Sequence, residues 1–272
     1  MKYIKLLINF LGVLYTQRNI MYALVIRDFK SRYLSSYIGL PWAFIQPAAY
    51  IFVIWFAFTY GIRHGGNTSS GIPYVAWLIT GLIPWLFISQ TLIVSCASIN
   101  QYAYLIKKTN FPVNMIPIIK ILSGMIVHVI LIIIMMMLLI FFYNLPPTIY
   151  WLQIFYYQFA MLFLFSGIAW FVASINVFIK DMAHIVNILV TMLFWATPIL
   201  WSFAKLEGNY RYIALLNPFF YITEGYRYTF VEEIWFFEFT EMNILFWAVS
   251  ISIFVIGVFT FKKLKPDFGD VL

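Results

Sequence analysis

His128 is the residue of this sequence that comes nearest to a chemical role, because it is ionisable and lies in a long apolar stretch. No carboxylate pair, His and Asp cluster or Ser and His arrangement occurs at a spacing that supports catalysis or metal binding. A single histidine in such a stretch usually forms a hydrogen bond with a neighbouring helix. The sequence therefore predicts no catalytic residue and no metal site, and it favours a structural role for His128.

The sequence also lacks the groups that would power transport. It has no Gly-Lys-Ser or Gly-Lys-Thr of a P-loop. The long apolar stretches carry no Asp, Glu, Lys or Arg in their interiors, whereas transporters driven by protons or sodium usually keep such groups there. We expect no cofactor in this chain and no ATP hydrolysis by it. If the protein transports actively, a separate protein supplies the energy.

Two apolar stretches place aromatic and polar side chains on one side of a helix. The first face comprises Trp42, Gln46, Tyr50, Phe56 and Tyr60, and the second comprises His184, Asn187, Thr191, Trp195, Pro198 and Ser202. Because a polar group that faces lipid is costly, both faces should point toward protein or water. Two interpretations stay open: helix packing through hydrogen bonds, or a conduit in which aromatic rings slide along sugars.

Composition identifies the surroundings of these faces. The 272 residues are 64% hydrophobic and only 10% charged, whereas an average soluble domain has about 25% charged residues. This composition excludes a soluble enzyme, a disordered chain and a nucleic-acid-binding module, so no nucleic-acid partner is expected. The single cysteine excludes a disulfide framework. The chain is predicted to be an all-α integral membrane protein.

The rare charged residues delimit the membrane spans. The uncharged intervals between them can each hold helices of about 20 residues, and the turn Asn144–Pro147 divides the longest interval. The sequence predicts a single domain over 1–272 with six transmembrane helices, near 38–60, 73–98, 117–143, 152–178, 184–203 and 243–261.

Lysine and arginine predict the orientation. With both termini in the cytoplasm, 13 of the 17 basic residues fall on the inner side. Segment 1–36 is expected to hold an N-terminal amphipathic interfacial helix, because Met21–Arg32 alternates apolar and basic residues and would lie on anionic membrane lipids. Its Arg27, Lys30 and Arg32 could attract a diphosphate headgroup, although simple anchoring on the inner side explains them equally well.

The outer segment between the last two predicted spans is too apolar for a loop in water. Its distinctive residues are Asn217, Pro218, Phe219, Phe220, Tyr221, Glu224 and Arg227. Asn-Pro is a good helix start, and Gly225 offers a break. We expect a re-entrant hairpin that dips into the outer leaflet and is buried against protein. Glu224 and Arg227 are three residues apart and can pair on one helix face.

Several motifs in chain order resemble the ABC-2 type permeases that export cell-surface polymers. The motifs are Ile26–Tyr33, Tyr37–Trp42, Gln46-Pro47, Leu105–Pro112, Asn176–Asp181, Thr197–Trp201 and Asn217-Pro218. The resemblance covers nearly the whole chain, although Lys180 stands where the family usually has Arg.

The resemblance implies a homodimer in the cytoplasmic membrane of a bacterium, together with two copies of a cytoplasmic ATPase that binds ATP and Mg. The first and fifth helices of each copy would line the path of an undecaprenyl-diphosphate-linked polymer. A coupling helix near 100–112 would contact the ATPase through Tyr104, Lys107, Lys108 and Phe111.

Within this family, Tyr60–Arg63, Gly71–Tyr74 and Tyr221–Arg227 look most like the permeases for wall teichoic acid. The resemblance leaves O-antigen or capsular polysaccharide export as an alternative. A second alternative is the export of small hydrophobic drugs, with the aromatic residues forming an apolar pocket. A scaffold that transports nothing is a third.

Overall fold

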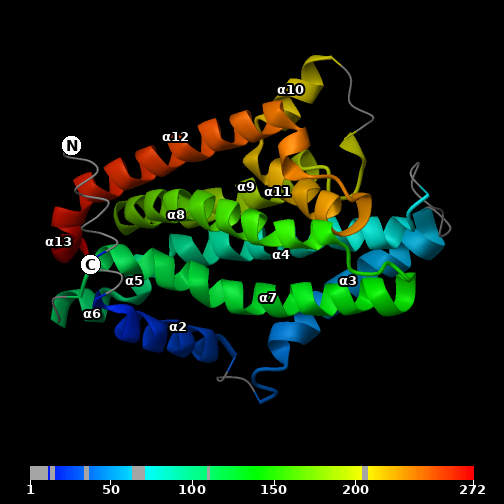
Figure 1. Cartoon of the computed structure of the whole chain (residues 1–272). Coiled ribbons are helices and arrows are strands. Elements are labelled where there is room, and N and C mark those ends of the chain that lie inside the picture. Colours follow the sequence, from blue (N-terminus) through cyan, green and yellow to red (C-terminus); the bar gives the residue numbers. More distant parts are fainter. Residues whose placement is uncertain (1–11, 13–15, 34–36, 63–70, 109–110, 204–207) are drawn as a thin grey trace.

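The computed structural model describes residue 12 and residues 16–33, 37–62, 71–108, 111–203 and 208–272, and these residues form helices and no strand (Figure 1). The helices are α2 (Arg18–Tyr33), α3 (Trp42–Phe56), α4 (Tyr74–Cys96), α5 (Ser98–Gln101), α6 (Ala103–Lys108), α7 (Ile116–Tyr143), α8 (Ile154–Phe178), α9 (Met182–Ala196), α10 (Asn209–Leu215), α11 (Pro218–Arg227), α12 (Thr240–Leu264) and α13 (Phe268–Val271). Two π-helical segments, Ala57–Ile62 and Tyr228–Glu232, continue α3 and α11. Short 3-10 helices occur at Val113–Met115, Ile149–Gln153, Phe236–Glu238 and Lys265–Asp267. The predicted all-α class is confirmed.

Five helical segments of the described chain are long and apolar enough to cross a membrane. They are Trp42–Gly61, Tyr74–Cys96, Val113–Tyr143, Ile149–Phe178 and Thr240–Val271. Each coincides with one of the predicted spans near 38–60, 73–98, 117–143, 152–178 and 243–261.

The predicted span near 184–203 is not confirmed at full length. Its helix, α9, has 15 residues, which is roughly 22 Å of helix and less than the roughly 30 Å of a bilayer core. Pro198 explains the early end, because a proline pushes the residue before it out of the α region. Thr197 is indeed extended, with φ −88° and ψ 133°.

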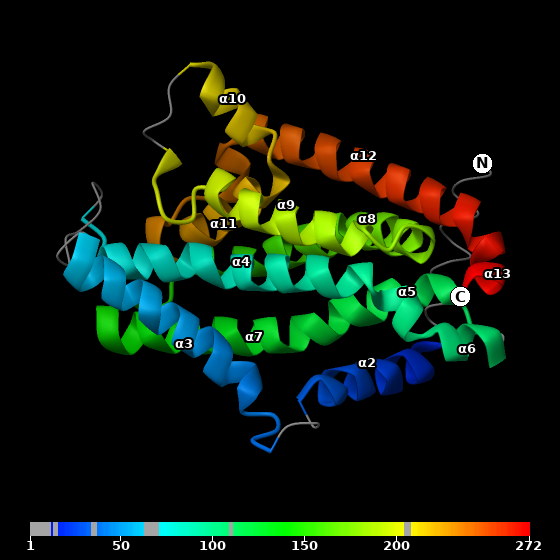
Figure 2. The same cartoon turned by 180° about the vertical axis from the view of Figure 1, so that it is seen from behind.

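Helix α4 forms the centre of the bundle, and Figure 2 shows it between α3 and α9. In the most apolar part of each span, 72% of the α4 residues are buried, compared with 6% of those in α3. Helix α4 contacts α7, α8, α9 and α11. Helix α3 therefore lies on the outside of the subunit with most of its surface uncovered.

Helices α8 and α12 approach closely where two glycines meet. A Cβ atom added to Gly257 would lie 2.1 Å from the Gly167 carbonyl oxygen, and one added to Gly167 would lie 2.6 Å from the Phe254 Cα atom. Small residues at such crossings let two backbones pack directly in a membrane. Both glycines are therefore required by packing.

The predicted N-terminal helix is present as α2, and it runs lengthwise beside the first half of α7 (Figures 1 and 2). Val25 of α2 packs on Met115 and Ile119. The contact of α2 with lipid stays a prediction. The other residues of the predicted segment, at 1–11, 13–15 and 34–36, lie outside the described residues.

The segment between α9 and α12 contains the two short helices α10 and α11. Asn217 caps α11 by accepting a hydrogen bond from the Phe219 amide at 3.0 Å, and Pro218 occupies the first turn, as predicted. The predicted break at Gly225 is wrong, because α11 continues to Arg227. The reason for the glycine is a close contact, since a Cβ atom at position 225 would lie 2.0 Å from the Tyr157 ring. The predicted re-entrant hairpin is not confirmed and stays a prediction.

The glycine crossing gives a test of the packing of α12. We expect Gly257→Val to lower the thermal stability of the purified protein, because overpacking a helix contact costs about 1–3 kcal/mol. Gly269→Val is the matched control, since no atom lies within 4 Å of the position of its added Cβ. Thermal unfolding in detergent measures both variants, and equal unfolding temperatures would contradict the assigned contact.

Candidate functional site

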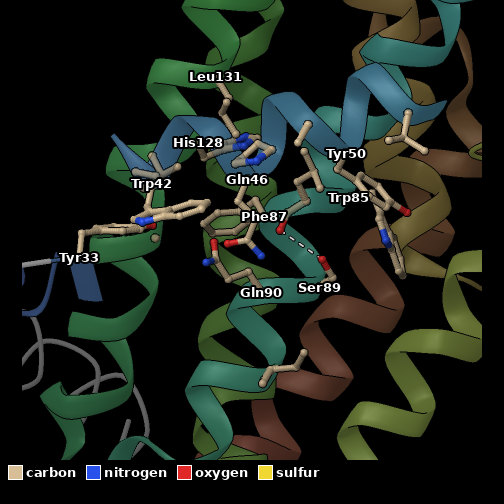
Figure 3. Close-up of a pocket in the computed structure, with 18 residues that line it drawn as sticks. Tyr33, Trp42, Gln46, Tyr50, Trp85, Phe87, Ser89, Gln90, His128 and Leu131 are labelled. Atoms are coloured by element: carbon tan, nitrogen blue, oxygen red, sulfur yellow. Dashed lines mark hydrogen bonds between the residues drawn. The ribbon is translucent and has the colours of Figure 1, made fainter. Parts of the chain in front are cut away.

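A cavity of about 600 Å³ lies between α3, α4 and α7. Its α3 wall includes Trp42, Gln46 and Tyr50, which are three residues of the first predicted face. Figure 3 shows Tyr33 and Trp42 at one end of the cavity, Tyr50 and Trp85 at the other, and Gln46, Gln90 and His128 between them. The volume falls within the range of roughly 300–1,000 Å³ that is typical of small-molecule sites.

The other predicted pathway residues do not line this cavity. Phe56 ends α3 and Tyr60 lies in the π-helical segment that continues it; both are exposed, and their rings contact each other with centroids 5.3 Å apart. The first face therefore has two parts: Trp42, Gln46 and Tyr50 line the cavity, and Phe56 and Tyr60 do not.

The second predicted face lies on α9, on the other side of α4 (Figure 2). Asn187, Thr191 and Trp195 are exposed, and Ser202 is half-buried beyond the end of the helix. The two polar side chains bond to the backbone of their own helix, with Asn187 donating to the Ala183 carbonyl at 2.8 Å and Thr191 to the Asn187 carbonyl at 3.1 Å. Within one subunit, the structure does not bring the two faces together.

Helices α4 and α7 contribute cavity residues that the sequence interpretation missed, namely Trp85, Phe87, Ser89, Gln90 and His128. His128 was recognised as a lone histidine in a span, but a helical pattern on one helix does not reveal what a second helix packs beside it. The polar pair Ser89 and Gln90 within an apolar stretch was the available signal.

His128 belongs to a buried hydrogen-bond network that joins three helices. Its Nε2 atom lies 2.6 Å from the Tyr226 hydroxyl of α11 and 3.3 Å from the Gln158 amide nitrogen of α8. Gln158 also donates to the Tyr226 hydroxyl. The predicted structural role of His128 is therefore confirmed, and the same side chain lines the cavity.

Arg227 is fully buried and anchors α11. Its guanidinium donates to the Pro198 carbonyl at 2.7 Å and the Ile199 carbonyl at 2.8 Å. It also pairs with Glu224 at 2.5 Å, which confirms the predicted pair. Because of Pro198, the segment that follows α9 lacks helical hydrogen bonds. The Arg227 guanidinium donates hydrogen bonds to the backbone carbonyls of this irregular segment.

The same guanidinium packs on the central helix. Its Cζ atom lies 3.4 Å from the centroid of the Trp77 ring, which is a cation–π contact. The space for it exists because residue 81 is glycine, since an added Cβ would lie 2.5 Å from Arg227 Nη2. One side chain therefore connects α4, the end of α9 and α11.

A second ionic cluster lies where α2 meets α7. Asp28 is buried and pairs with Arg32 at 2.8 Å and with the buried Lys120 of α7. Tyr102 donates to Asp28 Oδ1 at 3.4 Å. Burial raises the pKa of Tyr102 to about 12, with a further contribution from the Asp28 charge, so the phenol stays protonated.

The three predicted headgroup residues differ in their surroundings. Arg27 and Lys30 are exposed on α2. Arg32 is partly buried and engaged, because it also donates to the Lys120 carbonyl at 3.3 Å. Its charge is therefore used within the protein, and only Arg27 and Lys30 remain as surface cations of this set.

The predicted coupling segment lies at one end of the bundle, where Figure 1 shows α5, α6 and α13 together. Tyr104, Lys107 and Lys108 of α6 are exposed, and the Tyr104 side chain is 77% accessible. Phe111 is half-buried and packs on the cluster that contains Met115 and Ile119. An exposed aromatic and two cations on a short helix form a surface suited to a protein partner.

Comparison with known proteins assigns the family. The family model described as "ABC-2 type transporter" matches residues 20–231. The chain therefore belongs to the ABC-2 type transporter family, and it is a membrane permease subunit whose ATPase is a separate polypeptide.

Curated relatives of this chain carry the name O-antigen export system permease protein RfbA. Two from Klebsiella pneumoniae are 26% and 27% identical over 248 residues, which cover 90% of this chain and 92% of each relative. One from Myxococcus xanthus is 27% identical over 231 residues, covering 84% of this chain and 86% of the relative. These names support polysaccharide export. They do not support the predicted wall teichoic acid type, and they favour the O-antigen alternative.

The Arg227 anchor predicts a large loss of stability when it is removed. We expect Arg227→Met to lower the thermal stability strongly, because removing one partner of a buried ion pair costs about 3–5 kcal/mol. Arg211→Met is the matched control, since Arg211 is exposed. If Arg227→Met does not fold, Gly81→Ala tests the same contact by crowding the guanidinium. Thermal unfolding similar to that of the native protein for both Arg227→Met and Gly81→Ala would contradict the anchor.

The Asp28 cluster predicts a specific effect on α2. Burial by itself raises the pKa of Asp28, but the hydrogen bond from Lys120 and the charge of Arg32 outweigh it and hold the pKa below its ordinary value. The carboxylate therefore stabilises the contact above its unfolded pKa of about 3.9, and this contribution is lost as the pH falls through the lowered pKa.

At neutral pH, Asp28→Asn should leave Lys120 buried without a counter-charge and loosen α2. We expect faster amide hydrogen exchange across 18–33, measured by mass spectrometry. Asp267→Asn, at an exposed site, is the matched control. Unchanged exchange in Asp28→Asn would show that the apolar contacts of Val25 hold α2 without the ion pair.

Proposed function

We propose that this chain is the permease of an ATP-driven exporter that moves an O-antigen-type polysaccharide across the bacterial cytoplasmic membrane. The observation that carries the proposal is the cavity of about 600 Å³ on α3, where Trp42, Gln46 and Tyr50 combine ring faces with an amide. This combination suits a sugar, which presents both C–H faces and hydroxyls. The printed names of the relatives support the same class of substrate.

A homodimer would complete the pathway. In one subunit, α3 is the least covered span, and α9 exposes Asn187, Thr191 and Trp195. A polar face is costly in lipid, so a second copy would cover it or enclose it in a polar path. The predicted pairing of the α3 and α9 faces would then occur between copies, because α4 separates them within one.

The energy would come from two copies of a cytoplasmic ATPase, which bind ATP and Mg. The exposed Tyr104, Lys107 and Lys108 would receive the ATPase, and Phe111 would transmit the motion to the start of α7. Asp28 links the same region of α7 to α2. Movement of the coupling segment would thus reach both helices.

The substrate would be linked to undecaprenyl diphosphate and would enter from the inner leaflet. Both termini would lie in the cytoplasm, where the exposed Arg27 and Lys30 could attract the diphosphate. The hairpin of α10 and α11 would lie in the outer leaflet, with Asn217, Pro218, Phe219, Phe220, Tyr221, Glu224 and Arg227 forming the outer gate. These residues, apart from the half-buried Asn217 and Pro218, are buried in the subunit.

Deletion of the gene in the native host tests this proposal. We expect loss of surface polysaccharide and accumulation of its lipid-linked precursor on the cytoplasmic side, both restored by the native chain. Trp42→Ala should restore export only in part, several-fold below the native rate, because one aromatic contact contributes about 0.5–1.5 kcal/mol. Quantified surface polysaccharide and precursor are the measurements.

The matched control is Phe141→Ala on α7, at an aromatic side chain that is 75% exposed and outside the cavity. It should restore full export at equal protein level. Unchanged surface polysaccharide after deletion would refute polysaccharide export and direct attention to small-molecule export. Equal effects of the two substitutions would refute the role of the cavity.

A further inference from the structure

A second hollow of the subunit, here named the α9 groove, has a volume of about 760 Å³ and is lined by residues of α8, α9, α10 and α12. Helix α10 lies beside the start of α12 (Figures 1 and 2). Three of the lining residues, Leu189, Leu216 and Ile256, are 47%, 55% and 53% exposed. The groove is therefore open to the surroundings of the subunit and is not a void enclosed in its core.

The lining of the α9 groove is apolar or aromatic apart from Asn217. Both polar atoms of the Asn217 side chain are engaged, since its amide donates to the Thr197 hydroxyl at 2.9 Å and its oxygen accepts from the Phe219 amide at 3.0 Å. The indole of Trp201 donates to the Trp195 carbonyl at 3.2 Å. Water or a sugar would find few partners here, whereas apolar cavities favour hydrocarbon. The groove therefore suits a hydrocarbon chain.

Helix α9 turns one face to this groove and its polar face away from it. The α9 residues that line the groove are Met182, Val186, Leu189, Leu193 and Ala196. The centre of this set and the centre of the polar set Asn187, Thr191 and Trp195 are about 180° apart at 3.6 residues per turn. A second copy that covers the polar face, as in the proposed homodimer, would leave the groove facing the bilayer.

The dimensions of the groove fit one lipid chain. From Met182 to Ala196 its α9 wall is about 21 Å long, at 1.5 Å per residue. One leaflet contributes roughly 15 Å to the hydrocarbon core of a bilayer. A chain from a single leaflet can therefore lie extended along the groove.

Helix α10 offers groups for a lipid headgroup. Tyr210 lines the groove and is 72% exposed, and tyrosine favours the headgroup level of a membrane. The next residue, Arg211, is exposed, and its Cζ atom lies 5.0 Å from the centroid of the Phe203 ring. Among the described residues between α9 and α11, Arg211 is the one cation and there is no acid. This local charge favours an anionic headgroup.

We propose that the α9 groove binds one acyl chain of an anionic phospholipid from the outer leaflet, with the lipid phosphate at Tyr210 and Arg211. The bound chain fills the space between α9 and α12 and supports a helix that is too short to cross the bilayer by itself. This inference goes beyond the proposed function, and it rests on that function only for the position of the second copy and the outer placement of α10.

Native mass spectrometry of the full chain, purified in detergent and titrated with lipid, tests the proposal. The probes are phosphatidylglycerol, phosphatidylcholine with the same acyl chains, and undecaprenyl phosphate. We expect one phosphatidylglycerol per chain, bound more tightly than either other probe. Ile256→Trp and Leu189→Trp should each weaken this binding roughly tenfold, because the larger ring excludes about two methylene groups of the chain from the groove.

The headgroup contact has its own variant. Arg211→Gln should weaken binding of phosphatidylglycerol roughly two- to fivefold, the effect of one exposed ion pair, and should remove the preference over phosphatidylcholine. An unchanged preference in this variant would overturn the assigned position of the phosphate.

Ile251→Trp is the matched control, because Ile251 lies on α12, is 50% exposed and does not line the groove. It should bind lipid like the native chain. Equal loss in Ile251→Trp, full binding by either groove variant, or tighter binding of undecaprenyl phosphate would overturn the proposal. Dissociation of a dimer in Ile256→Trp with unchanged lipid binding would also overturn it and assign the groove to a second copy. Deletion of the gene reports on export independently, so loss of surface polysaccharide together with absence of bound lipid would reject only this inference.

Discussion

The buried guanidinium of Arg227 is the contact on which the packing of α11 depends. It replaces the helical hydrogen bonds that Pro198 removes after α9, and it packs on the central helix over Gly81. An irregular backbone in an apolar bundle needs such partners, because each unsatisfied carbonyl costs several kcal/mol where water is absent. The position of α11 against α4 and against the segment after α9 depends on this arrangement.

The second buried ionic cluster, around Asp28, also holds helices together, at the other end of the bundle. There it fixes α2 on α7, near the exposed helix α6 that is predicted to contact the ATPase. Between the two clusters the cavity contains polar groups and no charge. Among the described residues, the buried ions of these two clusters are paired and hold helices together, and the residues that line the cavity are uncharged.

Helix α3 combines the least buried span with the cavity wall. A helix with few contacts to its own subunit costs little to move, and its uncovered face can accept a second copy. Trp42 and Gln46 therefore lie on the span that is least buried in its own subunit, whereas α4 and α8 are the most buried spans.

The sequence by itself determined the helical class, five of the spans, the start of α11 at Asn217-Pro218 and the pair of Glu224 with Arg227. These features depend on local properties: the length of uncharged stretches, the capping chemistry and the spacing of three residues on one helix face. It also identified the part of α3 that lines the cavity.

Only the tertiary structure decided the other walls of the cavity, because Trp85, Gln90 and His128 reach it through contacts between helices that no periodicity encodes. The same holds for the burial of Arg227 and for the engagement of Arg32 by Asp28. The two polar faces of α3 and α9 are separated within a subunit for the same reason: a helical pattern shows that a face needs a partner, and packing alone decides which partner it meets.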